Sequence, residues 1–242
     1  MSSEQFSNSN NEQPQRFSSL PVWLLIVMIL VGGGIASFLL LRGIVWGVES
    51  IALYDIHTWE KGFQSYVRTF HEEPIRTIML FFTYMGSFYS TVFVALSFSI
   101  LLMVHNMYRE GLALLVTTAG AWQINVLLKS FFMRPRPDLE FWTHASGYSF
   151  PSGHSTIAAA MYGMLFVIWG MHRKRHQLSL TLPIVCGILL IVGIGLSRVY
   201  LGVHYPTDII GGYIAGSLWL TACAYSLHLW RKSDPQRTSI RY

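Results

Sequence analysis

The chain has 242 residues, of which 52% are hydrophobic and only 12% are charged, against about 25% charged residues in ordinary soluble domains. Together with a mean hydropathy of +0.41, this composition excludes a typical soluble protein and predicts one integral membrane bundle. The net charge of +5 is not arranged as a basic stripe among exposed aromatic residues, so we expect no nucleic-acid partner. Cys186 and Cys223 both lie in apolar stretches, which favours buried free thiols over a disulfide or a metal site.

In chain order, the sequence begins with a segment rich in Ser, Asn and Gln, and we expect residues 1–19 to be a disordered cytoplasmic N-terminus. The segment lacks the pattern of a cleavable signal, so the apolar run from Leu20 predicts a retained first span. A helix needs about 20 apolar residues to cross the hydrocarbon layer. We therefore predict an all-α, polytopic membrane domain over residues 20–230, with six transmembrane helices near 20–42, 86–106, 111–132, 154–171, 182–199 and 209–230. Residues 231–242 are predicted to be a cytoplasmic C-terminal tail.

The region between the first two spans has a different character. Residues 44–74 carry seven charged groups and no sustained apolar run, which predicts amphipathic helices at the membrane surface. Residues 75–85 are apolar but adjoin the second span, so the combined run is longer than one crossing requires. Gly86 is a candidate break between an interfacial helix and the span, and the sequence leaves this boundary open.

Basic residues indicate the orientation of the spans. Arg109 follows the second span, residues 173–175 follow the fourth, and Arg231 and Lys232 follow the sixth. Short loops rich in Lys and Arg face the cytoplasm, so we expect a multi-pass protein of the plasma or inner membrane with both termini in the cytoplasm. The 133–153 and 200–208 loops then face outward.

Three polar clusters fall at the extracytoplasmic ends of the last four spans. They are Lys129 with Arg136-Pro137, then Pro151-Ser152-Gly153-His154, then Ser197-Arg198 with His204 and Asp208. The hydropathy pattern and the polar pattern are independent of each other and indicate the same membrane face. The sequence therefore predicts a single site assembled from all three clusters.

The third cluster has the residues of an oriented nucleophile. Asp208 follows His204 by four residues across Pro206, a spacing that lets the carboxylate accept a hydrogen bond from one ring nitrogen. The other nitrogen would then be free to attack phosphorus, as in the orienting logic of catalytic triads. A His-x3-Asp pair taken alone is more typical of a helix cap or a surface ion pair, and it is the surrounding SR-x5-H-x3-D pattern beside a membrane span that favours catalysis. Arg198, six residues before His204, is suited to neutralise a phosphoryl oxygen.

The second cluster precedes an apolar helical run. Free N–H groups at a helix start favour an anion, so Ser152 and Gly153 are candidate phosphate donors. His154 is a candidate general acid for the leaving group and then a base for water. The alternative for Ser152 taken alone is a plain helix cap, and for His154 a polar residue at the interface.

The first cluster ends the third span. Lys129 taken alone is typical of a lysine that extends to the membrane interface, but Arg136, seven residues later, allows both cations to converge on one phosphate. Arg134-Pro135 repeats the Arg-Pro dipeptide at a different spacing. We interpret Arg134 as a residue that contacts a lipid headgroup or lies behind the site.

Read as K-x6-RP, PSGH and SR-x5-H-x3-D, the three clusters resemble the signature of the type 2 phosphatidic acid phosphatase family over roughly residues 75–230. The resemblance implies a six-span helical bundle and an enzyme that needs no metal and no cofactor. It implies that His204 becomes phosphorylated, that Asp208 orients it and that His154 handles the leaving group. It further implies phosphate binding by a set of five residues, namely Lys129, Arg136, Ser152, Gly153 and Arg198.

A site at the outer membrane boundary suits a lipid whose phosphate lies in the headgroup layer. Phosphatidylglycerophosphate, phosphatidic acid and undecaprenyl pyrophosphate all meet this condition, and the sequence does not decide between them. The first alternative function is a membrane phosphotransferase that passes the phosphoryl group to a lipid or sugar hydroxyl. The others are a non-catalytic protein that binds or transports phosphate lipids and a vanadate-dependent haloperoxidase. The oligomeric state is not indicated.

Overall fold

The computed structural model describes residues 21–233 except residues 52, 71 and 141. Every regular element in this part of the chain is helical, which confirms the all-α fold class. The expected disordered N-terminus and most of the expected C-terminal tail lie outside the described residues. The helices are α1 (Val22–Ile51), α2 (Leu53–Arg68), α3 (Ile75–Met85), α4 (Phe88–Val104), α5 (Tyr108–Phe132), α6 (Gly153–Ile157), η1 (Ala158–Tyr162), α7 (Gly163–Arg175), α8 (Thr181–Tyr200) and α9 (Pro206–Lys232).

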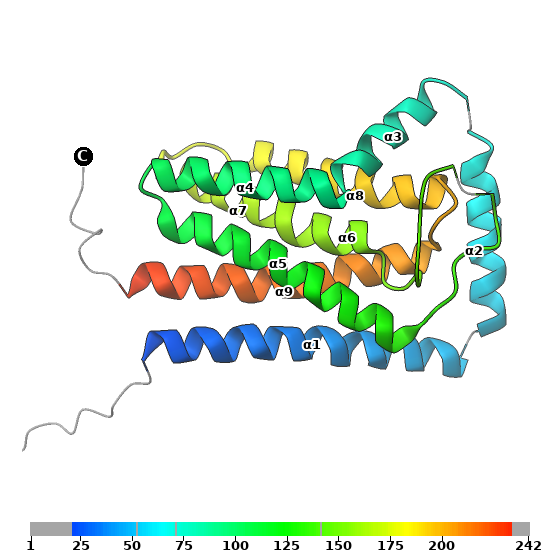
Figure 1. Ribbon diagram of the computed structural model, residues 1–242, viewed down its shortest axis with the longest axis horizontal. Coiled ribbons are helices and arrows are strands. Elements are labelled where there is room, and N and C mark those ends of the chain that lie inside the picture. The colour runs from blue at the N-terminus through cyan, green and yellow to red at the C-terminus, as the bar shows by residue number, and fades with distance from the viewer. Residues whose placement is uncertain (1–20, 52, 71, 141, 234–242) are drawn as a thin grey trace, which may run out of the picture.

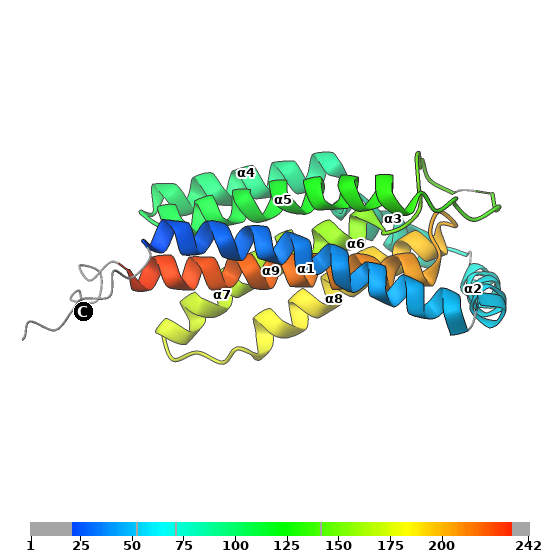
Figure 2. The same ribbon diagram turned by 90° about the horizontal axis from the view of Figure 1, so that it is seen from below.

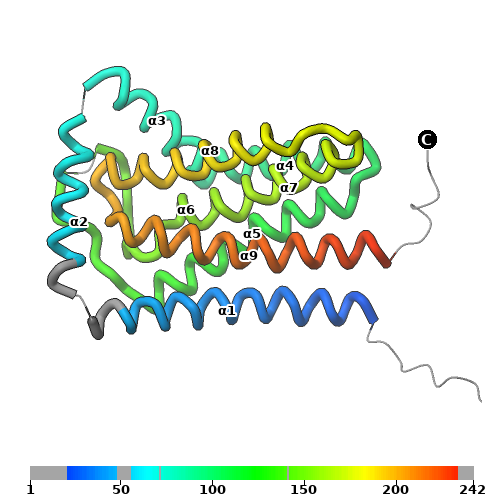
Figure 3. The backbone as a smooth tube through the Cα atoms, turned by 180° about the vertical axis from the view of Figure 1, so that it is seen from behind, coloured from blue at the N-terminus to red at the C-terminus, as the bar shows by residue number. Residues whose placement is uncertain are grey.

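The long helices run side by side along the long axis of the molecule, and α2 lies across one end of them (Figure 1). In Figure 2, α4 and α5 lie along one side of the bundle and α7 and α8 along the other, with α1 and α9 between them. Helices α6, η1 and α7 form one continuous stretch, the central helix, with α9 packed against α6 and η1 and α1 along the outer side of α9 (Figure 3). Side chains of Ile157, Met161 and Met164 are fully buried in this central helix. The core of the bundle is therefore built around the segment that starts at the PSGH cluster.

The predicted membrane spans are confirmed in number if one bent pair of helices counts as a span. Five helical stretches are long and apolar enough to cross a membrane, and α3 with α4 forms a sixth that is bent by 58°. Large apolar side chains such as Val31, Leu189 and Phe93 stand exposed on the outside, where lipid would cover them. The first helix continues to Ile51, nine residues beyond the predicted end near 42, because residues 43–47 remain largely apolar.

The break between α3 and α4 occurs at Gly86, the candidate that the sequence offered. Gly86 caps α3 by donating its N–H to the carbonyl of Phe82 at 3.2 Å, and Ser87 caps α4 by accepting from the N–H of Ser90. The hydroxyl of Tyr162 donates to the carbonyl of Met85 at 2.8 Å. The bend is therefore fastened to the central helix at its π-helical segment, η1.

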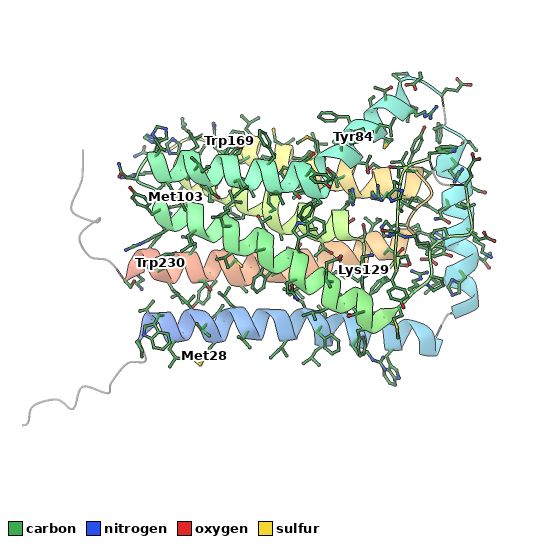
Figure 4. All side chains as sticks on the ribbon, in the orientation of Figure 1. Met28, Tyr84, Met103, Lys129, Trp169 and Trp230 are labelled. Carbon is green, nitrogen blue, oxygen red and sulfur yellow. The ribbon has the colours of Figure 1, made fainter. Side chains whose placement is uncertain are left out.

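The bundle has two chemically different ends. At one end, Arg231 pairs with Glu110 at 3.4 Å and Arg109 donates to the carbonyl of Trp230 at 3.0 Å. Trp169 and Trp230 lie toward this end in Figure 4, and Lys129 lies toward the opposite end, where α2 crosses. The basic loops and the polar clusters are thus separated along the bundle as the sequence predicts.

Candidate active site

The nucleophile candidate lies in the short loop that joins α8 to α9. His204 is 2% exposed, and Asp208 is fully buried in the first turn of α9, where a carboxylate is favoured by the helix dipole. Nδ1 of His204 lies 3.2 Å from Oδ2 of Asp208, and the same oxygen accepts the backbone N–H of Tyr205 at 2.9 Å. This geometry favours the tautomer in which Nδ1 carries the proton and donates it to Asp208.

The other ring nitrogen of His204 faces a cation. Nη1 of Arg136 lies 3.3 Å from Nε2 of His204, and because a guanidinium can only donate, Nε2 must accept. The remaining donors of Arg136 bond to the carbonyls of Ser146, Gly147 and Val203 at 2.7–3.0 Å. Nε2 therefore presents its lone pair to the cationic part of the site.

Burial and nearby charge keep this imidazole neutral. Burial, together with the charges of Arg198, Lys129 and Arg136, holds the pKa of His204 well below its ordinary value of 6.5. Both causes act in the same direction, because a low-dielectric site and a nearby cation each oppose a second positive charge. At neutral pH the ring is an uncharged base with an available lone pair.

Arg198 and Lys129 complete the cationic lining. Arg198, in the last turn of α8, is 4% exposed; its Nη1 donates to Oγ1 of Thr83 at 2.6 Å. Its Nε is buried without a hydrogen-bond partner among the described residues, a costly state that an entering anion would relieve.

Nζ of Lys129 donates to the carbonyl oxygen of Tyr148, and the same Nζ lies 3.3 Å from the carbonyl oxygen of Ser149. Lys129 is therefore directed at the loop before α6 rather than standing alone at the interface.

The PSGH cluster forms the start of the central helix. Ser152 caps α6, and its Oγ accepts the N–H of Ser155 at 3.4 Å, so the cap interpretation of Ser152 holds. Gly153 and His154 follow as the first helical residues, where N–H groups have no acceptor within the helix. These N–H groups can bind an anion at the helix end.

Close packing of α9 on α6 brings the second and third clusters together. The N–H of Ser152 donates to the carbonyl of Asp208 at 2.9 Å. A Cβ on Gly212 would lie 2.7 Å from the carbonyl oxygen of Ser152, so only glycine permits this approach at that position. Behind the loop, Nδ2 of Asn125 donates to the carbonyl of Pro151 and to Oγ1 of Thr156, both at 3.2 Å.

His154 is held on the side of the α3–α4 bend. A Cβ on Gly86 would lie 2.8 Å from Cδ2 of the His154 ring, so the ring packs directly on the bend. His154 also interacts electrostatically with His204 and Arg198. The two histidines and the cations thus belong to one cluster.

Comparisons with known proteins identify the family of this arrangement. The sequence pattern of the PAP2 superfamily matches residues 110–232, just over half of the chain. The chain belongs to the PAP2 superfamily. This confirms the resemblance that the three motifs carry.

Several known proteins are similar to the chain. Phosphatidylglycerophosphatase B of Bacillus subtilis is 37% identical over 112 residues, which cover 45% of this chain and 54% of that protein. The putative undecaprenyl-diphosphatase YbjG of Escherichia coli is 35% identical over 128 residues, or 51% of this chain and 56% of that protein. The chain thus spans about half the length of the curated relatives it matches. The crystal structure of the transmembrane PAP2-type phosphatidylglycerolphosphate phosphatase from Bacillus subtilis has a TM-score of 0.68 at 21% identity, covering 88% of this chain and 96% of that one, which supports the fold.

All eight site residues predicted from the sequence lie at the end of the bundle that α2 crosses, in the last turns of α5 and α8, at the starts of α6 and α9, or in the adjoining loops. Their individual roles, and the expected independence of metals and cofactors, stay predictions. Among the described residues no group of three or more His, Cys, Asp or Glu side chains could hold a metal ion.

A cavity of about 220 Å³ lies away from this cluster, on η1, α8 and α9. Its lining is predominantly apolar, which makes it unsuitable for a phosphate. It is formed by Ala159, Ile188, Ile191, Val192, Tyr213, Ser217 and Leu220.

Several residues that support the candidate site were not predicted from the sequence. Asn125 and Thr83, on α5 and α3, are 2% and 3% exposed, and a polar side chain within a membrane span is a signal that could have indicated Asn125. Glu60 and Gln64, on α2, are also buried. Their spacing of four residues places them on one helix face, but the surface-helix interpretation of residues 44–74 gave no reason to direct that face at the site.

Proposed function

We propose that this protein hydrolyses the terminal phosphate of a membrane lipid phosphate through a phosphohistidine intermediate on His204. The observation that carries the proposal is the state of this one ring. Its Nδ1 lies 3.2 Å from Asp208, its Nε2 faces the cationic lining, and burial among cations keeps it neutral. A binding or transport protein would have no use for a neutral, oriented imidazole at this position.

In the first step, the lone pair on Nε2 of His204 attacks phosphorus in line with the bond to the leaving oxygen. The P–N bond forms, the P–O bond breaks, and His154 supplies a proton to the leaving alkoxide. Asp208 accepts the Nδ1 proton in a hydrogen bond and stabilises the positive charge that develops on the ring. Lys129, Arg136 and Arg198 offset the negative charge on the phosphoryl oxygens. In comparable sites such groups stabilise the transition state by several kcal/mol.

In the second step, water attacks the phosphohistidine. His154, now neutral, takes a proton from that water, the P–N bond breaks, and inorganic phosphate leaves. His154 is thereby protonated again for the next substrate. Nε2 recovers its lone pair, and the chain returns to its starting state.

The substrate that we propose is a lipid with its phosphate in the outer headgroup layer, with phosphatidylglycerophosphate first. Two facts support a lipid: the polar cluster lies at one end of a membrane bundle, and similar proteins are named for phosphatidylglycerophosphate and undecaprenyl diphosphate. Phosphatidic acid and undecaprenyl pyrophosphate are the other candidates. The partners that follow are the bilayer and this lipid, with no nucleic acid.

The test is phosphate release by the purified protein in detergent with EDTA present. Phosphatidylglycerophosphate, phosphatidic acid and undecaprenyl pyrophosphate are compared, with His204→Ala as the control. We expect release that survives EDTA and is lost in the variant, while the variant remains folded in the membrane. Full activity in His204→Ala would remove the phosphohistidine mechanism. Release only when a lipid or sugar alcohol is added would favour the phosphotransferase alternative.

A further inference from the structure

Helix α2 places a buried carboxylate behind the catalytic pair. Glu60 has no exposed surface, although its helix lies across the end of the bundle (Figure 1). A buried carboxylate is costly unless it is paired and hydrogen-bonded. Its Oε2 accepts from Nη2 of Arg134 at 2.7 Å, and its Oε1 accepts from the hydroxyl of Thr207.

Arg134 bridges this carboxylate to Asp208. Its Nη1 lies 2.8 Å from Oδ1 of Asp208 and 2.7 Å from Oγ1 of Thr207. The guanidinium also stacks on the Tyr205 ring, 4.2 Å from its centroid. Both ends of the guanidinium are therefore engaged by carboxylates, which leaves Arg134 poorly placed to bind a substrate phosphate.

The two oxygens of Asp208 consequently face different partners. Oδ2 accepts from His204 and from the N–H of Tyr205, and Oδ1 accepts from Arg134. A carboxylate fixed at both oxygens cannot rotate away from the imidazole. The same helix α2 also fixes the histidine backbone, because Nε2 of Gln64 donates to the carbonyl of His204 at 2.9 Å.

We propose that Glu60 and Arg134 are positioning residues, which lock the carboxylate of Asp208 and thereby set the orientation and proton affinity of His204. Helix α2 is then part of the catalytic centre. This inference rests on the proposed function of His204 as nucleophile. It assigns to Arg134 a task other than binding a headgroup.

The proposal predicts opposite electrostatic effects for the two residues. The charged or titratable groups that surround His204 come from five helices and the loop between α5 and α6; they are Lys129, Arg136, His154, Arg198 and Asp208, with Arg134, Glu60 and its neighbour His57 behind Asp208. Removing the Arg134 cation frees the full charge of Asp208 to act on the imidazole, so the pKa of His204 rises. Neutralising Glu60 leaves the Arg134 charge less compensated, so the pKa of His204 falls further.

The experiment measures His204 directly and through turnover. The full chain, labelled with ¹⁵N-histidine in detergent micelles, is titrated by NMR, and the His204 signals are identified by their loss in His204→Ala. Variants are Glu60→Gln, Arg134→Met and Arg134→Lys, the last of which keeps the charge but loses the two-ended contact. Lys61→Met and Glu72→Gln, at exposed positions, are the matched controls. The same variants are assayed for kcat and KM with the lipid phosphate that the wild type hydrolyses fastest.

We expect His204 to titrate at higher pH in Arg134→Met and at lower pH in Glu60→Gln, with no change in the controls. We expect kcat to fall by about 10- to 100-fold, the range typical of groups that orient metal-binding side chains, with KM nearly unchanged. Arg134→Lys should lose kcat with a smaller change in the His204 titration. If Arg134→Met does not fold, Glu60→Gln and Arg134→Lys carry the test.

The outcomes of this experiment separate the positioning role of Glu60 and Arg134 from the proposed function of His204. Unaltered His204 titration and kcat in folded Glu60→Gln and Arg134→Lys would overturn the positioning role and reduce the network to an anchor for α2. A fall in thermal stability alone would have the same meaning. The expected titration shifts without any phosphate release in the wild type would support the positioning role and contradict the proposed function.

Discussion

At the residue scale, the chemistry of this site depends on which nitrogen of His204 carries the proton. Asp208 and Arg136 determine this between them, because one can only accept and the other can only donate. Their contacts lie at 3.2 Å and 3.3 Å on opposite nitrogens of the ring. The imidazole is thus held in the tautomer whose Nε2 carries no proton. An unprotonated Nε2 is what attack on phosphorus requires.

Replacing Asp208 with Asn tests the orienting carboxylate. The amide keeps the shape of the side chain but removes the charge that stabilises the developing imidazolium, and it can present an N–H to Nδ1. We expect kcat to fall by about 10²–10⁴-fold, with a much smaller change in KM, in steady-state assays of phosphate release. The exposed Asp138→Asn is the control. An unchanged kcat in folded Asp208→Asn would remove the orienting role.

The pH dependence of kcat/KM tests the neutral state of His204. The pKa of His204 lies below 6.5 because burial and the charges of Arg198, Lys129 and Arg136 oppose protonation. The nucleophile is lost only when pH falls through this lowered pKa, so the acid limb of the profile should have its midpoint below pH 6.5. The second pKa of a phosphate monoester is about 6, so the substrate also titrates in this range. Its ionisation in micelles is measured by ³¹P NMR, and kcat/KM at each pH is corrected for the fraction of each ionised form. A corrected midpoint at or above pH 6.5 would contradict the assigned environment of the ring.

At the element scale, three irregular features position the site: the bend at Gly86, the π-helical segment η1 and the crossing helix α2. The bend places Thr83 and Gly86 against Arg198 and His154. Tyr162 of η1 holds the bend by its bond to Met85, and π-helical segments are frequent at functional sites. These elements contain none of the motif residues, yet they fix where the motif residues lie.

Gly86→Ala tests the contact between the bend and His154. The new methyl carbon would lie 2.5 Å from Cγ2 of Ile194 and 2.8 Å from Cδ2 of His154, so the ring or helix α3 must move. A displacement of about 1 Å can cost about 10²-fold in rate, and overpacking costs about 1–3 kcal/mol of stability. We expect a fall in kcat/KM of that order with a lowered thermal midpoint. Gly43→Ala, which meets nothing within 4 Å, should leave both unchanged, and equal behaviour of the two variants would refute the steric argument.

The sequence predicted the helical class, the six spans and the cluster because each has a local signal. Apolar runs mark the spans, and the eight motif residues have fixed spacings within the three clusters. The continuation of α1 to Ile51 and the support from Glu60 and Thr83 were not predicted. The support from Glu60 and Thr83 depends on contacts between residues 74 to 147 positions apart, such as Arg134 with Glu60 and Thr207 with Glu60. No periodicity within one helix reveals which distant residue its buried face meets.

At the scale of the whole molecule, the bundle separates charge along its axis. Basic side chains that contact Glu110 and Trp230 lie at one end, and Lys129 and helix α2 lie at the other (Figure 4). His154 and His204 belong to the same cluster as Lys129. Apolar side chains cover the surface between them. A lipid in the leaflet next to this end would bring its phosphate to His154 and His204 while its chains remain beside the apolar surface, which fits the proposed substrate class.

The distribution of basic loops predicts the orientation of this bundle in the membrane. Residues 173–175, Arg231 and Lys232 should remain in the cytoplasm, because basic loops are retained on that side, and the loop between α5 and α6 should then face outward. The test places single cysteines at His144 and Leu178, both exposed, in a chain that carries Cys186→Ala and Cys223→Ala. A membrane-impermeant maleimide applied to intact cells should label His144→Cys at once and Leu178→Cys only after the membrane is opened. The reverse pattern would place the site on the cytoplasmic face and would exclude substrates confined to the outer leaflet.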